Sequence, residues 1–249
     1  MKAASGRALL HVALASCLCV AAVRSGVFDS VFVQVGREHY AEAPLAGLPA
    51  FLAMPFNSLV NLAYVLLGAY WLQSEASAPG GPAEVQRARY LKDVFAGMAL
   101  VYGPVQWLRI ATQTRAAAVL DQWLTLPIFA WPVAWCLCLD WGWKPWLLLA
   151  VEGLSLSSYG LALLHPCGFE LALGVHMATA WARPCAPRGA AAARPRQSTW
   201  PWACSPAWAL WSSSCVTISL RGGLSSSGSR ATSGPKSATC SSSTLRSCS

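Results

Sequence analysis

Charged residues are scarce in this chain. They make up 11% of its 249 residues, whereas an ordinary soluble domain carries about 25%. This shortage excludes an ordinary soluble enzyme and most disordered proteins. The chain is instead rich in apolar residues, since 55% of it is hydrophobic, it has 13 tryptophans and its mean hydropathy is +0.43. Long uncharged runs of this composition predict a helical membrane protein.

Acidic residues are absent from the C-terminal part of the chain. Residues 1–182 contain ten basic and ten acidic residues, and residues 183–249 contain eight basic and no acidic ones. Because these cations are scattered among Ser, Pro and Ala, we expect no nucleic-acid-binding face. The chain therefore divides into a transmembrane helical domain, residues 1–182, and a disordered Ser/Arg/Pro-rich tail, residues 183–249.

The composition of the tail also suggests its origin. GC-rich coding DNA read in a shifted frame yields mostly Ser, Arg, Ala, Pro, Cys, Gly and Trp, which are the residues that dominate here. A naturally disordered tail is the alternative, but such a tail rarely begins inside a transmembrane helix. We therefore predict that the segment from about Trp181 onward is an out-of-frame translation.

Motifs of soluble-enzyme chemistry are also missing. The chain has no Gly-rich phosphate loop, no H-E-x-x-H and no C-x-x-C. Its closely spaced cysteines, Cys17 with Cys19 and Cys136 with Cys138, are two residues apart, which places their side chains about 200° apart on a helix and prevents either pair from chelating one ion. We expect no metal, no cofactor and no enzymatic activity.

Apolar runs define the predicted fold, an all-α multi-pass transmembrane bundle of five to six spans. The predicted spans are residues 7–28, 51–72, 94–111, 119–139 and 145–164, with an incomplete sixth at 169–182. The first run also resembles a signal-peptide core, but its cleavage site is poor, so we favour a retained helix. Residues 34–44 and 73–92 are predicted to be connections outside the membrane.

Basic residues near the predicted spans favour a cytosolic N-terminus. Alternating the spans places six such residues on the N-terminal side and four on the other, and Lys and Arg are enriched on the cytosolic side of membranes. Membrane lipids are the expected partners, nucleic acid is not, and the sequence identifies no protein partner.

Six polar residues within the predicted spans are the candidate functional residues: Asn57, Ser58, Asn61, Arg109, Asp121 and Glu152. Polar groups at this depth face protein rather than lipid. The two asparagines share a helix face around Ser58, and we interpret them as interhelical hydrogen-bonding groups, with a ligand or catalytic role as the alternative. Arg109 and Asp121 are predicted to form an interfacial ion pair, and separate contacts with lipid headgroups are the alternative.

Glu152 begins a polar stripe in the fifth predicted span, since Ser155 and Tyr159 follow at i+3 and i+7. An intramembrane carboxylate is a functional candidate, and a hydrogen-bonded structural Glu is the alternative. His176, in the incomplete sixth span, has no evident partner in the sequence.

Four strings of residues resemble a known family. They are residues 40–44 (YAEAP), 51–61 (FLAMPFNSLVN), 90–95 (YLKDVF) and 120–127 (LDQWLTLP). On these strings the chain closely resembles the transmembrane protein 187 family, from the N-terminus to about residue 180. The resemblance implies a multi-pass membrane protein with a retained first helix, in an endomembrane or vesicle, and assigns no biochemical activity. The tail departs from the family pattern, which continues with further apolar helices.

A fainter resemblance is to alkaline ceramidases and related seven-helix membrane hydrolases. It rests on Asn57-Ser58-x-x-Asn61, Leu120-Asp121 and Leu126-Pro127. In those enzymes a Ser, an Asp and three His build a zinc site that activates water, so the resemblance implies such roles for Ser58 and Asp121. The third-helix His is missing, since residues 103–107 read GPVQW.

We therefore expect a non-enzymatic membrane component. A lipid amidohydrolase, degenerate or active, is one alternative, and a small transporter that uses Glu152 is the other.

Overall fold

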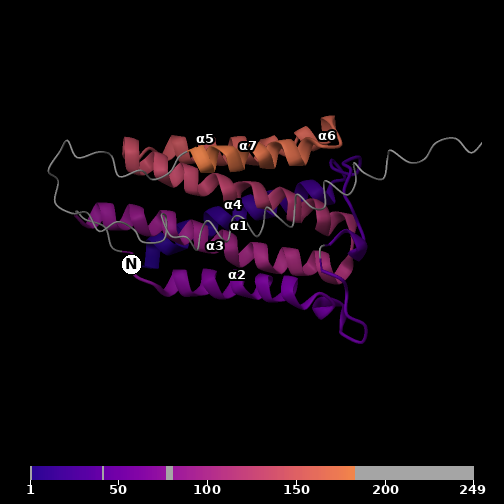
Figure 1. Cartoon of the computed structure of the whole chain (residues 1–249). Coiled ribbons are helices and arrows are strands. Elements are labelled where there is room, and N and C mark those ends of the chain that lie inside the picture. The colour runs from indigo at the N-terminus through magenta and orange to yellow at the C-terminus, as the bar shows by residue number, and fades with distance from the viewer. Residues whose placement is uncertain (1, 41, 77–80, 183–249) are drawn as a thin grey trace, which may run out of the picture.

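The computed structural model describes residues 2–40, 42–76 and 81–182, and this part of the chain is an all-α bundle without strands (Figure 1). Its helices are α1 (Lys2–Arg24), α2 (Pro55–Gln73), α3 (Pro82–Thr112), α4 (Arg115–Trp141), α5 (Pro145–Ser158), α6 (Leu161–Leu164) and α7 (Gly168–Ala182), with two short 3-10 helices, η1 (Arg37–His39) and η2 (Ala50–Leu52). The predicted fold class is confirmed. The predicted tail, residues 183–249, lies outside the described residues.

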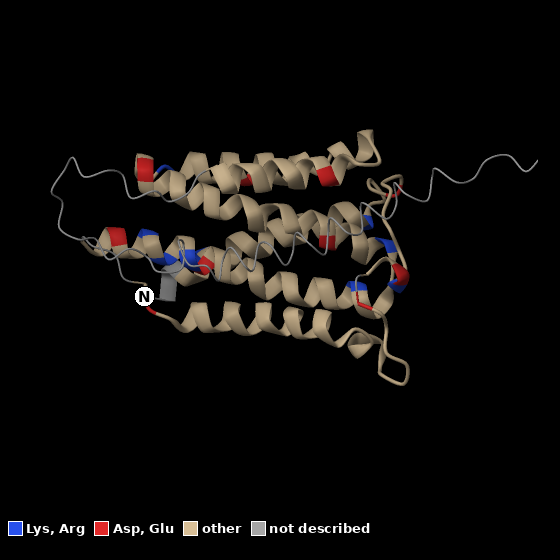
Figure 2. Ribbon diagram, viewed as in Figure 1, with Lys and Arg blue, Asp and Glu red and all other residues tan. Residues whose placement is uncertain are grey.

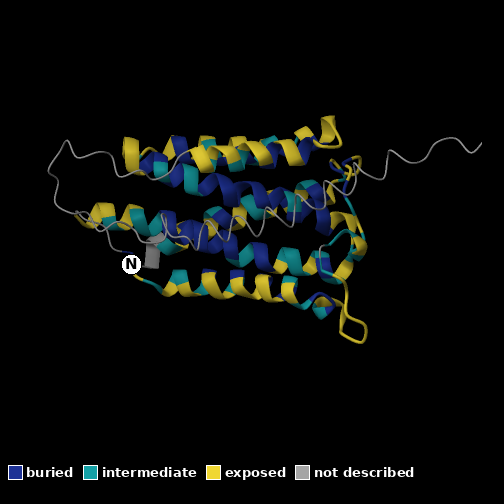
Figure 3. Cartoon of the chain, viewed as in Figure 1, coloured by how far each residue is buried: buried dark blue, intermediate teal, exposed yellow. Residues whose placement is uncertain are grey.

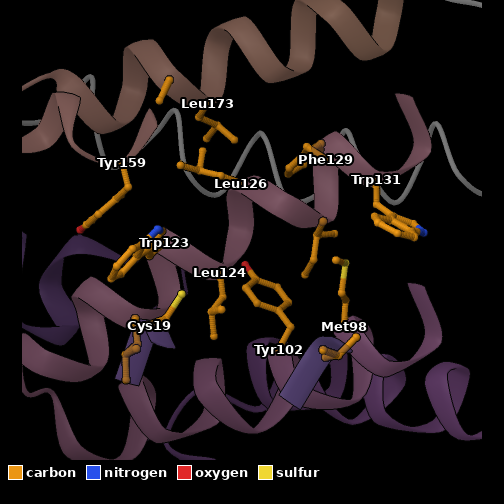
Figure 4. Close-up of a cluster of buried hydrophobic side chains, with 14 of the residues drawn as sticks. Cys19, Met98, Tyr102, Trp123, Leu124, Leu126, Phe129, Trp131, Tyr159 and Leu173 are labelled. Carbon is orange, nitrogen blue, oxygen red and sulfur yellow. The ribbon is translucent and has the colours of Figure 1, made fainter. Parts of the chain in front are cut away.

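Helix α4 lies at the centre of the bundle. It packs against α1, α3, α5 and α7, while α2 packs along the outer side of α3. Most of α4 is buried, whereas α2 and α5 expose long rows of residues (Figure 3). The core around α4 is aromatic and aliphatic, with Trp123, Leu126 and Trp131 packed toward the neighbouring helices (Figure 4).

The outer surface of the bundle is apolar, as a membrane requires. Leu14, Phe56, Leu154 and Leu164 are each more than half exposed, and charged residues gather toward the two ends of the bundle (Figure 2). A large apolar exterior with charged ends suits a protein surrounded by lipid.

Four helical segments are long and apolar enough to cross a membrane: Ser5–Arg24, Pro82–Thr112, Arg115–Trp141 and Pro145–Leu164. Helix α2 is not among these four segments. It has 19 residues, but its two asparagines lower its mean hydropathy. Helix α7 is described over 15 residues, which at 1.5 Å per residue covers about 22 Å of a hydrocarbon layer about 30 Å thick. With α2 and α7 alongside, the bundle is compatible with the predicted five to six spans.

Two predicted boundaries are wrong. The first helix ends at Arg24 rather than residue 28, because Gly26 turns the chain with a φ of +81°. The predicted connection 73–92 is largely helical, since α3 begins at Pro82, a residue suited to a first helical turn. Lys92 is buried there because its ammonium lies 2.8 Å from Asp93 and donates to the Trp71 carbonyl.

Candidate functional site

The imidazole ring of His11, midway along α1, is a meeting point of three other helices. Its Nε2 pairs with Oε2 of Glu152 in α5. Its Nδ1 lies 2.6 Å from the hydroxyl oxygen of Tyr90 in α3. The ring also meets Trp131 of α4 edge to face, with the ring centroids 5.8 Å apart. We call His11, Tyr90 and Glu152 the His11 centre.

In the His11 centre the carboxylate is buried, whereas His11 and Tyr90 are partly exposed. Glu152 is 5% exposed, and Trp143 packs edge to face against Tyr90 at a centroid distance of 5.8 Å. Glu152 Oε1 has no hydrogen-bond partner among the described residues. A buried carboxylate with an unsatisfied oxygen costs free energy of folding, which makes Glu152 a functional candidate rather than a stabilising one.

A cavity of about 20 Å³ adjoins Glu152. Val12 and Ser16 of α1, Met98 and Tyr102 of α3, and Leu124 of α4 are among its other lining residues. A volume of this size accommodates roughly one water molecule, which is stable only beside polar partners. Ser16, Tyr102 and Glu152 are the polar residues that line the cavity, in an otherwise apolar wall.

Ser155 and Tyr159, the other members of the predicted stripe, form hydrogen bonds outside the His11 centre. His176 Nδ1 donates to the Ala172 carbonyl at 2.7 Å, so Nε2 accepts from the Ser155 hydroxyl at 2.9 Å. Tyr159 donates to Gln122 Oε1 at 3.0 Å. The expectation that His176 lacks a partner is wrong, because its partner lies on a different helix. The stripe is thus three separate contacts between helices.

The predicted ion pair of Arg109 and Asp121 is present, with Arg109 Nη1 2.5 Å from Asp121 Oδ2. The guanidinium carbon of Arg109 also lies 5.6 Å from the centre of the Tyr40 ring, and Nη2 donates to the Gln34 carbonyl at 3.4 Å. Burial raises the pKa of Tyr40, so its phenol stays neutral. These contacts fix the connection after α1 against the end of the α3–α4 hairpin.

Asn57 and Ser58 contact the preceding connection rather than another helix. Asn57 donates to Glu42 Oε2 through its side-chain nitrogen at 2.8 Å and its backbone nitrogen at 2.9 Å, and Phe56 N donates to Glu42 Oε1 at 2.9 Å. Ser58 Oγ donates to the Phe51 carbonyl at 2.7 Å. Glu42 therefore caps the N-terminus of α2, where a negative charge is favoured.

Asn61 lies in the interface between α2 and α3. It is 1% exposed, and its side-chain nitrogen has no hydrogen-bond partner within residues 2–40, 42–76 and 81–182. Asn61 thus lies between helices, but its side-chain nitrogen does not make the predicted interhelical hydrogen bond among the described residues, and Asn57 bonds a connection instead.

The zinc site of the hydrolase resemblance does not fit these residues. Ser58 is committed to a backbone carbonyl and Asp121 to Arg109. In the part of the chain that the structure describes, no three His, Cys, Asp or Glu side chains gather closely enough to hold a metal ion.

Two members of the His11 centre, His11 and Tyr90, are not among the candidate residues predicted from the sequence. His11 stands out in the sequence only as an interruption of the first apolar run, and Tyr90 falls in the predicted connection 73–92. The signal that identifies Glu152 applies equally to His11, since an ionisable residue inside a span is expensive unless it has a partner. The partners themselves are 79 and 141 residues away along the chain.

Comparison with known proteins gives one family. Residues 8–191 match the TMEM187 protein family. A protein named Transmembrane protein 187 from Bos taurus is 79% identical over 180 residues, which are 72% of this chain and 70% of that protein. One of the same name from Homo sapiens is 70% identical over 175 residues, 70% of this chain and 65% of the human protein, so the match spans just under two thirds of the latter. No solved structure matches the chain.

Proposed function

The chain belongs to the TMEM187 protein family, and we propose that this multi-pass membrane protein is a small, non-enzymatic transporter that uses Glu152 as its proton-binding group. One observation carries the proposal. Glu152 is buried between membrane-length helices, is paired with His11 and keeps one carboxylate oxygen without a partner beside a cavity.

The His11–Glu152 pair is suited to holding a single proton. When the two groups share one proton, their combined charge is zero, whether the proton lies on the imidazole or on the carboxyl. Adding a second proton leaves a net positive charge in an apolar interior, and removing the first leaves a net negative one. Either change is costly in a low-dielectric environment. A gain or loss of a proton thus favours passing the excess charge on toward water at one side of the bundle, which is the step a proton-conducting transporter needs.

The lipid amidohydrolase alternative has weaker support. The side chains that would build its site, Ser58 and Asp121, take other partners. Hydrolysis of a ceramide by the purified full-length protein, lost in Ser58→Ala, would favour the hydrolase over the transporter.

Location and partners are part of the same proposal. An acidified endomembrane vesicle supplies the proton gradient that such a carrier uses, and lipids cover the exposed apolar side chains. Fluorescence microscopy of the tagged full-length chain against organelle markers tests the location, and a signal confined to the plasma membrane contradicts it.

Proton entry into proteoliposomes tests the transporter. Full-length protein is reconstituted into vesicles that contain a pH-sensitive dye, and a potassium gradient with valinomycin drives protons inward. We expect wild-type vesicles to acidify at least tenfold faster than protein-free vesicles, and Glu152→Gln to abolish the difference. Glu84→Gln, at an exposed glutamate near the start of α3, is the matched control. The proposal fails if wild type equals protein-free vesicles or if Glu152→Gln equals wild type.

A further inference from the structure

A second buried polar cluster lies between α3 and α4. Gln106 Nε2 donates to the Tyr102 hydroxyl at 2.6 Å, and that hydroxyl lies 2.9 Å from Thr125 Oγ1. Thr125 in turn donates to the backbone carbonyl of Asp121 at 2.7 Å. Because the Thr125 proton is used in that bond, Tyr102 donates to Thr125. We call Gln106, Tyr102 and Thr125 the Tyr102 chain.

The Tyr102 chain and the His11 centre lie at different depths of the bundle. Tyr90 and Tyr102 are separated on α3 by 12 residues, or about 18 Å along the helix axis. In Figure 4 the Tyr102 side chain extends from α3 toward α4, between Leu124 and Met98. The cavity beside Glu152 is lined by Tyr102 and Ser16 as well. The cavity therefore separates the two polar clusters.

The Tyr102 chain leads toward the ion pair at the α3–α4 end of the bundle. Asp121 lies four residues before Thr125, one turn away on the same face of α4. Asp121 Oδ2 binds Arg109, while Oδ1 has no hydrogen-bond partner among the residues that are described. A buried carboxylate with an unpartnered oxygen thus lies at each end of this polar series, Glu152 at one and Asp121 at the other.

We propose that these groups form a proton path through the bundle, from Glu152 through water in the cavity and the Tyr102 chain to Asp121. The inference rests on the proposed function, since Glu152 is the proton-binding group where the path begins.

Each transfer on this path exchanges one O–H bond for another. Glu152 gives its proton to the cavity water, which passes one of its own to the Tyr102 oxygen. Tyr102 passes its proton to Thr125, and Thr125 passes its own to the Asp121 carboxylate after its hydroxyl rotates away from the backbone carbonyl. Every intermediate oxygen gains one proton and loses one, and no group is oxidised or reduced.

Charged and titratable neighbours define the two ends of the path. Those that act electrostatically on or beside Glu152 are His11, Cys19 and Tyr90, with Arg7 next to Tyr90. Those that face Asp121 are Arg109, Tyr40 and Tyr159, with Arg115 near Tyr159. Because Arg109 attracts the Asp121 carboxylate, a proton reaches Asp121 when this ion pair opens, so the pair is the gate at that end.

The proteoliposome assay described above tests the path with conservative variants. Tyr102→Phe removes one oxygen, Thr125→Val replaces a hydroxyl with a methyl group, and Ala15→Leu fills the cavity that Ala15 lines. We expect each to reduce proton entry at least tenfold. Ala13→Leu, at an exposed position of α1, is the control and should match wild type.

An infrared measurement separates loss of the path from loss of the protein. The carboxyl stretch that Glu152→Gln removes should persist in all three variants, which shows that the His11 centre is intact. A variant that loses this band is misfolded at the His11 centre. The variants that keep the band then test the path. If Glu152→Gln blocks proton entry while the variants that keep the band conduct like wild type, the path is wrong and the proposed function stands. If wild type conducts no faster than protein-free vesicles, both fail.

Discussion

Gly103 of α3 lies directly against the backbone of Asn61 in α2, so that a Cβ atom added to the glycine would come within 2.7 Å of the Asn61 carbonyl oxygen. Gly68 of α2 faces α3 in the same way, since its added Cβ would lie 2.7 Å from the carbonyl oxygen of Ala96. These two glycines let the helices approach more closely than larger residues permit.

Gly103→Leu is expected to separate α2 from α3 and to lower the free energy of unfolding by about 1–3 kcal/mol, because its side chain collides with backbone atoms. Thermal unfolding in detergent measures the change. Gly153→Leu is the control, since nothing lies within 4 Å of a Cβ added at that exposed position of α5. Equal losses in the two variants would show that the close contact does not matter.

Glu42→Ala is expected to destabilise the protein by about 1 kcal/mol, because the first turn of α2 loses the carboxylate that accepts from its backbone N–H groups. The matched control is Glu75→Ala, at an exposed glutamate just beyond the C-terminus of α2, where a negative charge is not favoured. Chemical denaturation in detergent compares the two. The capping role is wrong if the control loses as much stability as Glu42→Ala.

Arg109→Met is expected to cost about 3 kcal/mol, because it leaves the Asp121 carboxylate buried without its cation. Asp121→Leu introduced together with it should recover much of this loss, since the double variant buries no unpaired charge. The exposed Arg24 at the end of α1 provides a control variant, Arg24→Met. Additive losses in the double-mutant cycle would mean that the two side chains do not stabilise one another.

The N-terminus is expected in the cytosol, and the connection that contains Gly47 on the other side of the membrane. Epitopes at these two positions are tested in cells whose plasma membrane is opened with digitonin. The N-terminal epitope should bind antibody, and the Gly47 epitope should need full permeabilisation. The reverse pattern inverts the predicted topology.

Reading the transcript in its other frames is expected to restore an apolar helical continuation after Met177. The physical reason is that the apolar run that begins at residue 169 gives way to a sequence rich in Ser, Arg and Pro after residue 182, short of the about 20 apolar residues that a span requires. Translation of the nucleotide sequence checks this. Stop codons or polar sequence in both frames would rule out the frame shift.

Much of the fold could be predicted from the sequence, because long apolar runs dictate helices whatever their neighbours are. The apolar run 145–164 predicts the observed bounds of the segment that contains α5 and α6, Pro145 and Leu164. The start of α3 was missed because Arg87, Arg89 and Lys92 give its first turns a polar composition. Whether such turns are helical depends on what they pack against, as with Lys92 beside Asp93 and Trp71.

The candidate site was only half predictable, for a related reason. Arg109 and Asp121 flank a short turn, so their proximity follows from the hairpin itself. The pairing of Glu152 with His11 depends on how α1 and α5 pack around α4, and no local pattern specifies that arrangement. The role of Glu42 was unpredictable for the same reason. It lies in a connection, 13 residues before the start of α2, and no local pattern indicates that it caps that helix.

The separation of His11 from Glu152 by 141 residues has a consequence for how the protein is made. A ribosome delivers α1 to the membrane long before α5 has been synthesised, so the imidazole enters the bilayer without its carboxylate. Until α5 arrives, only Tyr90 of α3 is there to bond the imidazole, so the first helix is less stable in the bilayer than in the finished bundle. A chain that stops before Glu152 keeps this cost.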